Sequence, residues 1–467
     1  MAQLHRVMGF GDLLLFYLVT GFTVRWIGTA AAAGPSALII WLIACAAFYV
    51  PLMLTVLELS SRYPGEGGCY IWSRRAFGDF AGFITGWTYW ACNLPYFPGL
   101  FYFTAATALF IGGPEWQSLS GQPSYFIAFS LTALALAAGL NVRGLGVGKW
   151  LHNLGAIGLW VPGLFLIGLG LAAWVRFGSA TPFTLENMVP STRLKDIVFW
   201  STIAFSLSGL ESASMMGEEI KDARRNIPRA LLSAGVLITL LYVLGTVAML
   251  VAMPPGEILH LQGFMTAIGS ASERLGVVHL VPVVALLVVV GGLGQGGAWF
   301  AASGRLPFVA GLDRFLPAAF GRIHPRFGSP YVSLLVQAAV AALFILLGQA
   351  GTTVKGAYDV LVSMTIISYF IPYLFIFASM IRLQREPAGP AVIRVPGGRP
   401  MAVALASLGL TVTSISIALA LIPAEDEPHK LLAVVKVAGL TILLVAGGAM
   451  VYFLGSRRRH ERRLTAG

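Results

Sequence analysis

The chain has 467 residues, of which 57% are hydrophobic and only 11% are charged, whereas soluble globular domains usually carry about a quarter charged residues. This composition excludes an ordinary water-soluble enzyme. The 31 lysines and arginines outnumber the 20 aspartates and glutamates, for a formal net charge of +11. Because these cations lie in short clusters between long apolar runs, we exclude nucleic acid as a partner and predict a lipid bilayer instead.

A helix needs about 20 mostly apolar residues to cross a bilayer. About twelve such runs follow one another along the chain. We place them at residues 10–32, 36–61, 78–111, 124–141, 149–175, 194–217, 229–253, 277–303, 330–348, 357–382, 401–422 and 431–455. Most lysines and arginines fall in the loops that share a side with the N-terminus. The positive-inside rule therefore predicts a multi-pass protein of the cell (inner) membrane with both termini cytoplasmic, ending in a basic tail at 456–467.

A charged residue inside the first run is the first functional candidate, because intramembrane charges are costly. Arg25 lies in a stretch whose glycines and hydroxyl residues weaken a helix. An interrupted helix exposes backbone N–H groups that suit a substrate carboxylate, and the Arg25 guanidinium adds a second anionic determinant. The alternative is that Arg25 pairs with a carboxylate or carbonyls of a neighbouring helix and holds the bundle together. The predicted site residues here are Gly21, Phe22, Thr23, Val24 and Arg25.

The run at 194–217 contains a second candidate interruption, a group of small hydroxyl residues around a glycine. Freed carbonyls there could hold an ammonium group or a cation. Glu211 is the only carboxylate near the middle of any predicted span, which suggests proton coupling or gating. The alternative is a fixed counter-ion for Arg25 or a structural hydrogen-bonded group. The predicted substrate residues of this run are Phe205, Ser206, Ser208 and Gly209.

The two interruptions fall in the first and the sixth predicted spans, which are corresponding positions of two five-helix halves. This placement is typical of transporters built from inverted repeats. We therefore divide the chain into repeats at 10–175 and 194–382, followed by two further helices at 401–455. Scattered histidines and cysteines show no metal or disulfide spacing, so we expect no cofactor beyond a coupling proton, and sodium stays open as a coupling ion.

Three separated motifs resemble the amino acid–polyamine–organocation superfamily of secondary transporters. These are residues 209–214 with 217–229, residues 58–64 with 66–70 and 75–78, and residues 305–317. The resemblance extends to the glutamate/GABA antiporter, arginine/agmatine antiporter and polyamine transporter branches. It implies an all-α membrane protein of about twelve helices with a LeuT-like 5+5 inverted repeat, broken helices 1 and 6, and two extra C-terminal helices.

By the same resemblance, Phe205, Ser208 and Glu211 belong to a substrate and gating face, and Trp299 is an aromatic that contacts substrate. Tyr96, in the third span, is similar to residues of two of these branches, and Ser363 and Thr365 face the site from the tenth span. The usual glycine–serine–glycine signature of the first helix is absent here. The chain is thus predicted to be no enzyme but a secondary active transporter of amino acids or related small carboxylates, proton-coupled or exchanging. An amine or polyamine permease is the alternative, and a non-transporting receptor is a remote one.

Overall fold

The computed structural model describes residues 5–191, 194–258, 261–313, 315–349, 354–422 and 430–465. Within these ranges the regular structure is helical, with two isolated β-bridges, Met8–Ile220 and Glu66–Met216. Among the described residues, eight stretches are long and apolar enough to cross a membrane: Phe10–Ala31, Ser36–Arg62, Pro123–Val142, Leu145–Phe177, Ala223–Ala252, Val278–Gly311, Met364–Leu383 and Gly398–Ala420. The protein is therefore a multi-pass membrane protein.

The α-helices follow in chain order as α1 (Phe10–Gly21), α2 (Val24–Ala31), α3 (Ser36–Ala44), α4 (Val50–Arg62), α5 (Gly68–Phe77), α6 (Asp79–Ala108), α7 (Pro123–Val142), α8 (Leu145–Phe177), α9 (Leu185–Met188), α10 (Leu194–Ser206), α11 (Ala223–Ala252), α12 (Gly263–Leu275), α13 (Val281–Leu312), α14 (Tyr331–Gln349), α15 (Val354–Leu383), α16 (Gly398–Ala420) and α17 (Lys430–Thr465). A π-helical turn at Cys45–Tyr49 joins α3 to α4. Short 3₁₀ turns lie at Gly113–Leu119, Ser212–Met215, Gly217–Glu219, Pro255–Glu257, Val278–Leu280 and Ala318–Gly321.

The first predicted span is broken in its middle. Helix α1 ends at Gly21 and α2 begins at Val24, and the two residues between them are extended, with φ, ψ of −122°, 133° at Phe22 and −146°, 131° at Thr23. A Cβ atom at Gly21 would lie 2.8 Å from Cδ1 of Ile238 on α11. The glycine therefore both weakens the helix and lets α11 approach the break.

The predicted span at 194–217 is α-helical only as far as Ser206, so the interruption that the sequence predicts around Gly209 is present, and 3₁₀ turns follow it up to Glu219. Gly209 has φ +107°, a conformation that L-residues rarely adopt. Beyond it, the hydroxyls of Ser212 and Ser214 donate to the carbonyls of Gly209 and Glu211, at 2.6 and 2.5 Å. Such local bonds compete with helical ones, which explains why 3₁₀ turns replace the second half of the helix.

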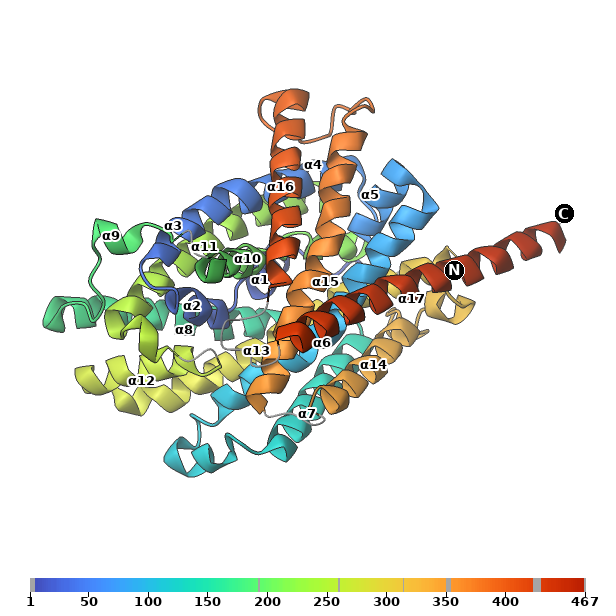
Figure 1. Ribbon diagram of the computed structural model, residues 1–467. Helices are drawn as coiled ribbons and strands as arrows, with labels where there is room; N and C mark the ends of the chain where they lie inside the picture. The colour runs from blue at the N-terminus through green and yellow to red at the C-terminus, as the bar shows by residue number, and fades with distance from the viewer. Residues whose placement is uncertain are drawn as a thin grey trace.

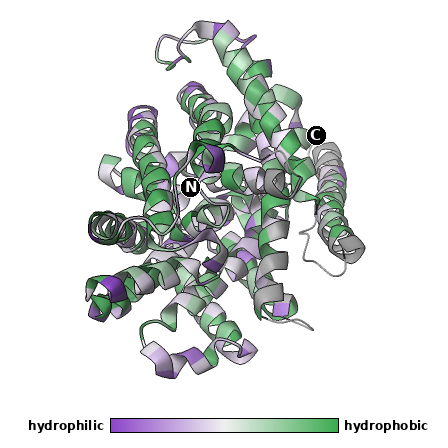
Figure 2. Cartoon of the chain, turned by 60° about the vertical axis from the view of Figure 1, so that its left-hand side comes forward, coloured by the Kyte–Doolittle hydropathy of each residue, from purple (hydrophilic) through white to green (hydrophobic). Residues whose placement is uncertain are grey.

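Close backbone contacts hold the bundle together. A Cβ atom at Gly155 of α8 would lie 2.5 Å from the Cα atom of Gly294 on α13, so small residues let these two helices touch. Helices α15 and α16 run side by side, and α17 crosses α6 (Figure 1). Much of the helical ribbon is coloured as hydrophobic (Figure 2), and many large apolar side chains are exposed, among them Leu171, Leu347 and Leu443, as in a helix surface that faces lipid.

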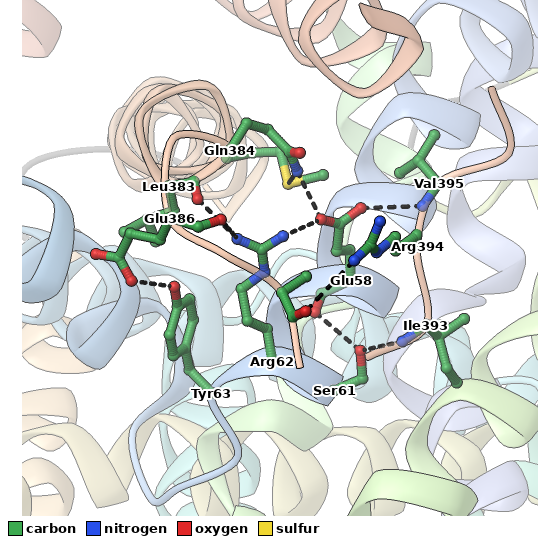
Figure 3. Close-up of polar contacts among 12 residues, drawn as sticks. Glu58, Ser61, Arg62, Tyr63, Leu383, Gln384, Glu386, Ile393, Arg394 and Val395 are labelled. Carbon is green, nitrogen blue, oxygen red and sulfur yellow. Dashed lines mark hydrogen bonds and ion pairs between the residues drawn. The ribbon is translucent and has the colours of Figure 1, made fainter. Parts of the chain in front are cut away.

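A polar network ties the segment after α15 to the end of α4 (Figure 3). The Glu58 carboxylate accepts hydrogen bonds from Arg62, from Gln384 at 2.6 Å and from the Val395 N–H at 2.9 Å. The Arg62 guanidinium also donates to the Leu383 carbonyl at 2.7 Å. Glu58 and Arg62 thus form an ion pair where the chain leaves the membrane-spanning helices, while the Arg62 Nε atom has no hydrogen-bond partner among the described residues.

Candidate functional site

Two side chains from other helices hold the break between α1 and α2. The Tyr242 hydroxyl of α11 donates to the Gly21 carbonyl and accepts from the Thr23 N–H, at 3.2 and 3.1 Å. The Gln295 amide nitrogen of α13 donates to the carbonyls of Val19 and Phe22, at 2.8 and 2.9 Å. Non-helical backbone inside a membrane needs such partners, so these two residues stabilise the break.

A cavity of about 20 Å³ lies between the two interrupted segments. This volume holds about one water molecule, so an organic substrate requires side chains around it to move. Seven of the predicted site residues line the cavity: Gly21, Thr23, Tyr96, Phe205, Ser206, Ser208 and Trp299. Its other lining residues were not among the predicted ones: Thr20, Trp26, Asn93, Tyr242 and Tyr369.

Arg25 lies in the first turn of α2, beside this cavity, and is only 2% exposed. Its guanidinium carbon lies 4.3 Å from the ring centroid of Trp26 and 5.2 Å from that of Tyr96. Its Nε atom is buried without a hydrogen-bond partner, and none of the ion pairs found among the described residues includes it. Aromatic faces compensate part of the cost of burying this charge, but they leave its hydrogen-bond donors available.

The Glu211 carboxylate is fully buried and is surrounded by tyrosines. Its Oε1 accepts from the hydroxyls of Tyr89 at 2.6 Å and Tyr369 at 2.9 Å, and its Oε2 accepts from the hydroxyl of Tyr373 at 2.8 Å. Tyr89 belongs to α6 and the other two belong to α15. The structure therefore gives Glu211 neutral hydroxyl partners, in place of the Arg25 counter-ion that the sequence left as an alternative.

The other predicted site residues lie around this centre. The Phe22 ring packs against Trp160 and Tyr242, and Val24 is fully buried. The Gly209 N–H donates to the Tyr373 hydroxyl at 3.2 Å. Thr365 and Phe205 line a narrow space beside Arg25, whereas the Ser363 side chain lies outside the described part of the structure.

The tyrosines around Glu211 and the two residues that hold the α1–α2 break were not predicted from the sequence. Tyr369 and Tyr373 are four residues apart, and this spacing places both on one face of α15. That spacing was the available signal. The sequence signal for Gln295 was weaker: it is a lone polar side chain within an apolar run.

A helical membrane protein in which two non-helical segments meet at a buried polar cavity has the architecture of a membrane transporter. Residues 7–457 match the model of a family described as amino acid permease. The chain belongs to this family of transporters.

The chain is also similar to curated relatives over most of its length. An uncharacterized transporter of Legionella pneumophila is 28% identical over 433 residues, which cover 91% of each chain. The glutamate/serine transporter AimA of Bacillus subtilis is 25% identical over 74% of this chain and 67% of its own. The probable agmatine/putrescine antiporter AguD of Lactococcus lactis is 22% identical over 94% of this chain and 93% of its own.

Proposed function

We propose that this permease is a secondary active transporter of amino acids or related small carboxylates, proton-coupled or exchanging. The observation that carries the proposal is the buried Arg25 guanidinium beside the cavity. A carboxylate satisfies such a group through two parallel charge-assisted hydrogen bonds. The N-terminus of α2 carries partial positive charge, so it supports an anion at the same place.

The proposal includes a topology and a transport cycle. The proposed topology is the LeuT-like arrangement of about twelve spans, with inverted repeats at 10–175 and 194–382 and two extra helices at 401–455. Both termini then lie in the cytoplasm. The breaks after Gly21 and Ser206 then occupy corresponding positions of the two repeats. Rocking of one part against the other would expose the cavity alternately to each side, and Glu211 would bind the coupling proton or gate the site.

An amine or polyamine permease is the second candidate, supported by the similarity to AguD. A polycation needs carboxylates at its site, but the one beside the cavity, Glu211, already accepts three tyrosine hydroxyls. Arg25 would repel a cation, since no carboxylate neutralises it within the described residues. These two observations favour the carboxylate substrate.

The test is a thermal-shift screen of the purified full-length protein with glutamate, serine, alanine, GABA, putrescine and agmatine. A ligand at 100 times its Kd stabilises the folded state by about 2.7 kcal/mol. We expect stabilisation by a carboxylate-bearing compound, and in Arg25→Met a loss of affinity of roughly 30-fold or more, because truncating a buried charge pair costs about 2–5 kcal/mol.

Arg274→Met is the matched control, because its guanidinium also stacks on a ring, 4.9 Å from the Phe177 centroid, but at the protein surface. It should bind like the wild type. Stabilisation by putrescine or agmatine alone, or unchanged carboxylate binding in a folded Arg25→Met protein, would overturn the proposal.

A further inference from the structure

Three charged side chains from three different segments meet in a second buried cluster, outside the substrate cavity. Glu66 comes from the connection between α4 and α5, Glu219 from the 3₁₀ turn that precedes α11, and Arg305 from α13. None of them is more than 6% exposed. They lie at the end of the bundle where we place the cytoplasm.

The hydrogen bonds of this cluster are distributed unequally. The Arg305 Nε and Nη2 atoms donate to the Glu219 carboxylate at 2.8 and 3.0 Å, and Nη1 donates to the Ala301 carbonyl at 2.7 Å. The Glu66 Oε2 atom accepts the Glu218 N–H at 3.1 Å. Its Oε1 atom lies 3.9 Å from Arg305 Nε and is buried without a hydrogen-bond partner.

One guanidinium therefore faces two buried carboxylates. With both carboxylates ionised, the cluster carries one uncompensated negative charge away from water, which is costly. A proton on Glu66 removes that charge and leaves the Arg305–Glu219 pair intact. Burial, together with the nearby Glu219 carboxylate, raises the pKa of Glu66 well above its usual range, against the opposing effect of Arg305.

The cluster also lies where three segments from different parts of the chain are joined at this end of the protein. The Glu219 carbonyl accepts the N–H groups of Val7 and Met8, at 3.0 and 3.2 Å, immediately before α1. The Gly67 N–H donates to the Met215 carbonyl at 3.0 Å. Opening would pull Glu66, Glu219 and the segment before α1 apart and hydrate both carboxylates.

We propose that Glu66 is a proton-binding residue that closes this end of the permease when protonated and favours its opening when ionised. The inference rests on the proposed function only in that opening is a step of alternating access. Because the closed state binds this proton more tightly than a hydrated open state, a fall in pH shifts the equilibrium toward the closed state.

Protons can reach the cluster through a cavity of about 200 Å³ that borders Glu219. The charged and titratable groups along it are His5, Arg143 and Arg326, all of them exposed. The exposed Glu218 carboxylate lies on the same turn as Glu219 and adds to the negative potential at Glu66. These groups lie in contact with water, whereas the Glu66 carboxyl is enclosed.

Hydrogen–deuterium exchange of the full-length protein in lipid nanodiscs tests the proposal without any substrate. The readout is the protection of peptides that contain Val7, Met8 and residues 217–221 between pH 5.5 and 8.5, after correction for intrinsic rates. In the wild type, protection should fall with rising pH by up to about tenfold per pH unit, the limit for one linked proton. In Glu66→Gln, which resembles the protonated state, protection should be high and independent of pH.

Glu218→Gln is the matched control, because it leaves Glu66 titratable. It should retain the pH dependence of the wild type, with a midpoint only slightly lower because one exposed negative charge is removed. A wild-type profile that does not change with pH would overturn the inference even if the Glu66→Gln protein failed to fold. So would a Glu66→Gln profile that retained the pH dependence of the wild type. The exchange experiment contains no substrate, so a failed ligand screen would leave its outcome unaffected.

Discussion

Replacing Tyr373 with phenylalanine removes one hydroxyl from the cluster around Glu211 and leaves the buried ring in place. That hydroxyl donates to Oε2 of Glu211 at 2.8 Å and accepts the N–H of Gly209 at 3.2 Å. The Tyr89 hydroxyl donates to Oε1 instead, which also accepts from Tyr369. Tyr373→Phe thus removes the hydroxyl that donates to Oε2 and the acceptor of the Gly209 N–H. Tyr89→Phe also removes two hydrogen bonds, because the Tyr89 hydroxyl accepts from Tyr369 at 3.2 Å, but the Tyr369 hydroxyl remains as a donor to Oε1.

The expected loss of stability follows from these bonds. A hydrogen bond to a charged group contributes about 1.5–3 kcal/mol, and a buried donor left without an acceptor costs about 1–3 kcal/mol. We therefore expect Tyr373→Phe to lower the free energy of unfolding by about 3–5 kcal/mol. For Tyr89→Phe, where one donor to Oε1 remains, we expect about 1–2 kcal/mol.

The assay is reversible unfolding in mixed micelles, followed by tryptophan fluorescence. Tyr17→Phe is the control, because the Tyr17 ring is fully buried and its hydroxyl has no hydrogen-bond partner among the described residues. Its effect should stay within about 0.5 kcal/mol or be stabilising. Equal losses in Tyr373→Phe and Tyr89→Phe, or a larger loss in Tyr89→Phe, would refute the assigned roles of these hydroxyls.

Three further predictions concern other polar groups. The Gln295 amide nitrogen already donates to the carbonyls of the α1–α2 break, so these carbonyls need no sodium ion as a partner. Wild-type thermal stability should therefore be equal in sodium chloride and choline chloride, whereas the stability of Gln295→Glu should depend on sodium. A sodium-dependent wild type would contradict this prediction. Glu58→Ala should cost about 3–5 kcal/mol because it leaves the buried Arg62 unpaired, and Glu386→Ala, at an exposed pair, about 1 kcal/mol or less. The hydrogen bonds from Tyr63 and then Arg75 lower the pKa of Glu386. The contribution of Glu386 to stability is therefore present at neutral pH and is lost on acidification through that lowered pKa. Thermal melts of Glu386→Ala and the wild type should converge at that acidic pH.

Several features were predictable from the sequence because they depend on residues near one another in the chain. Apolar length predicted membrane-spanning helices, and the membrane class is confirmed. The glycine and hydroxyl residues around Gly21 predicted a break in the first span, and the structure has one at Phe22 and Thr23. Seven predicted site residues line the cavity. Five of them belong to the two breaks, whereas Tyr96 and Trp299 come from α6 and α13 and were predicted from the family resemblance.

Other features could not be derived from local sequence. The partners of Glu211 are 122, 158 and 162 residues away, and no local pattern specifies which helices pack together. The short helix α5, which carries Arg74 and Arg75, falls between two predicted spans and is not revealed by apolar length.

The sequence by itself determined that this chain crosses a membrane and that its first span is interrupted, because apolar length and helix-breaking residues act locally. Only the tertiary structure decided the environment of each buried charge. Arg25 and Glu211 are both costly to bury, and packing placed one against aromatic faces and the other among tyrosine hydroxyls. The partner of a buried charge is set by the register between packed helices, which depends on side-chain contacts across the whole bundle.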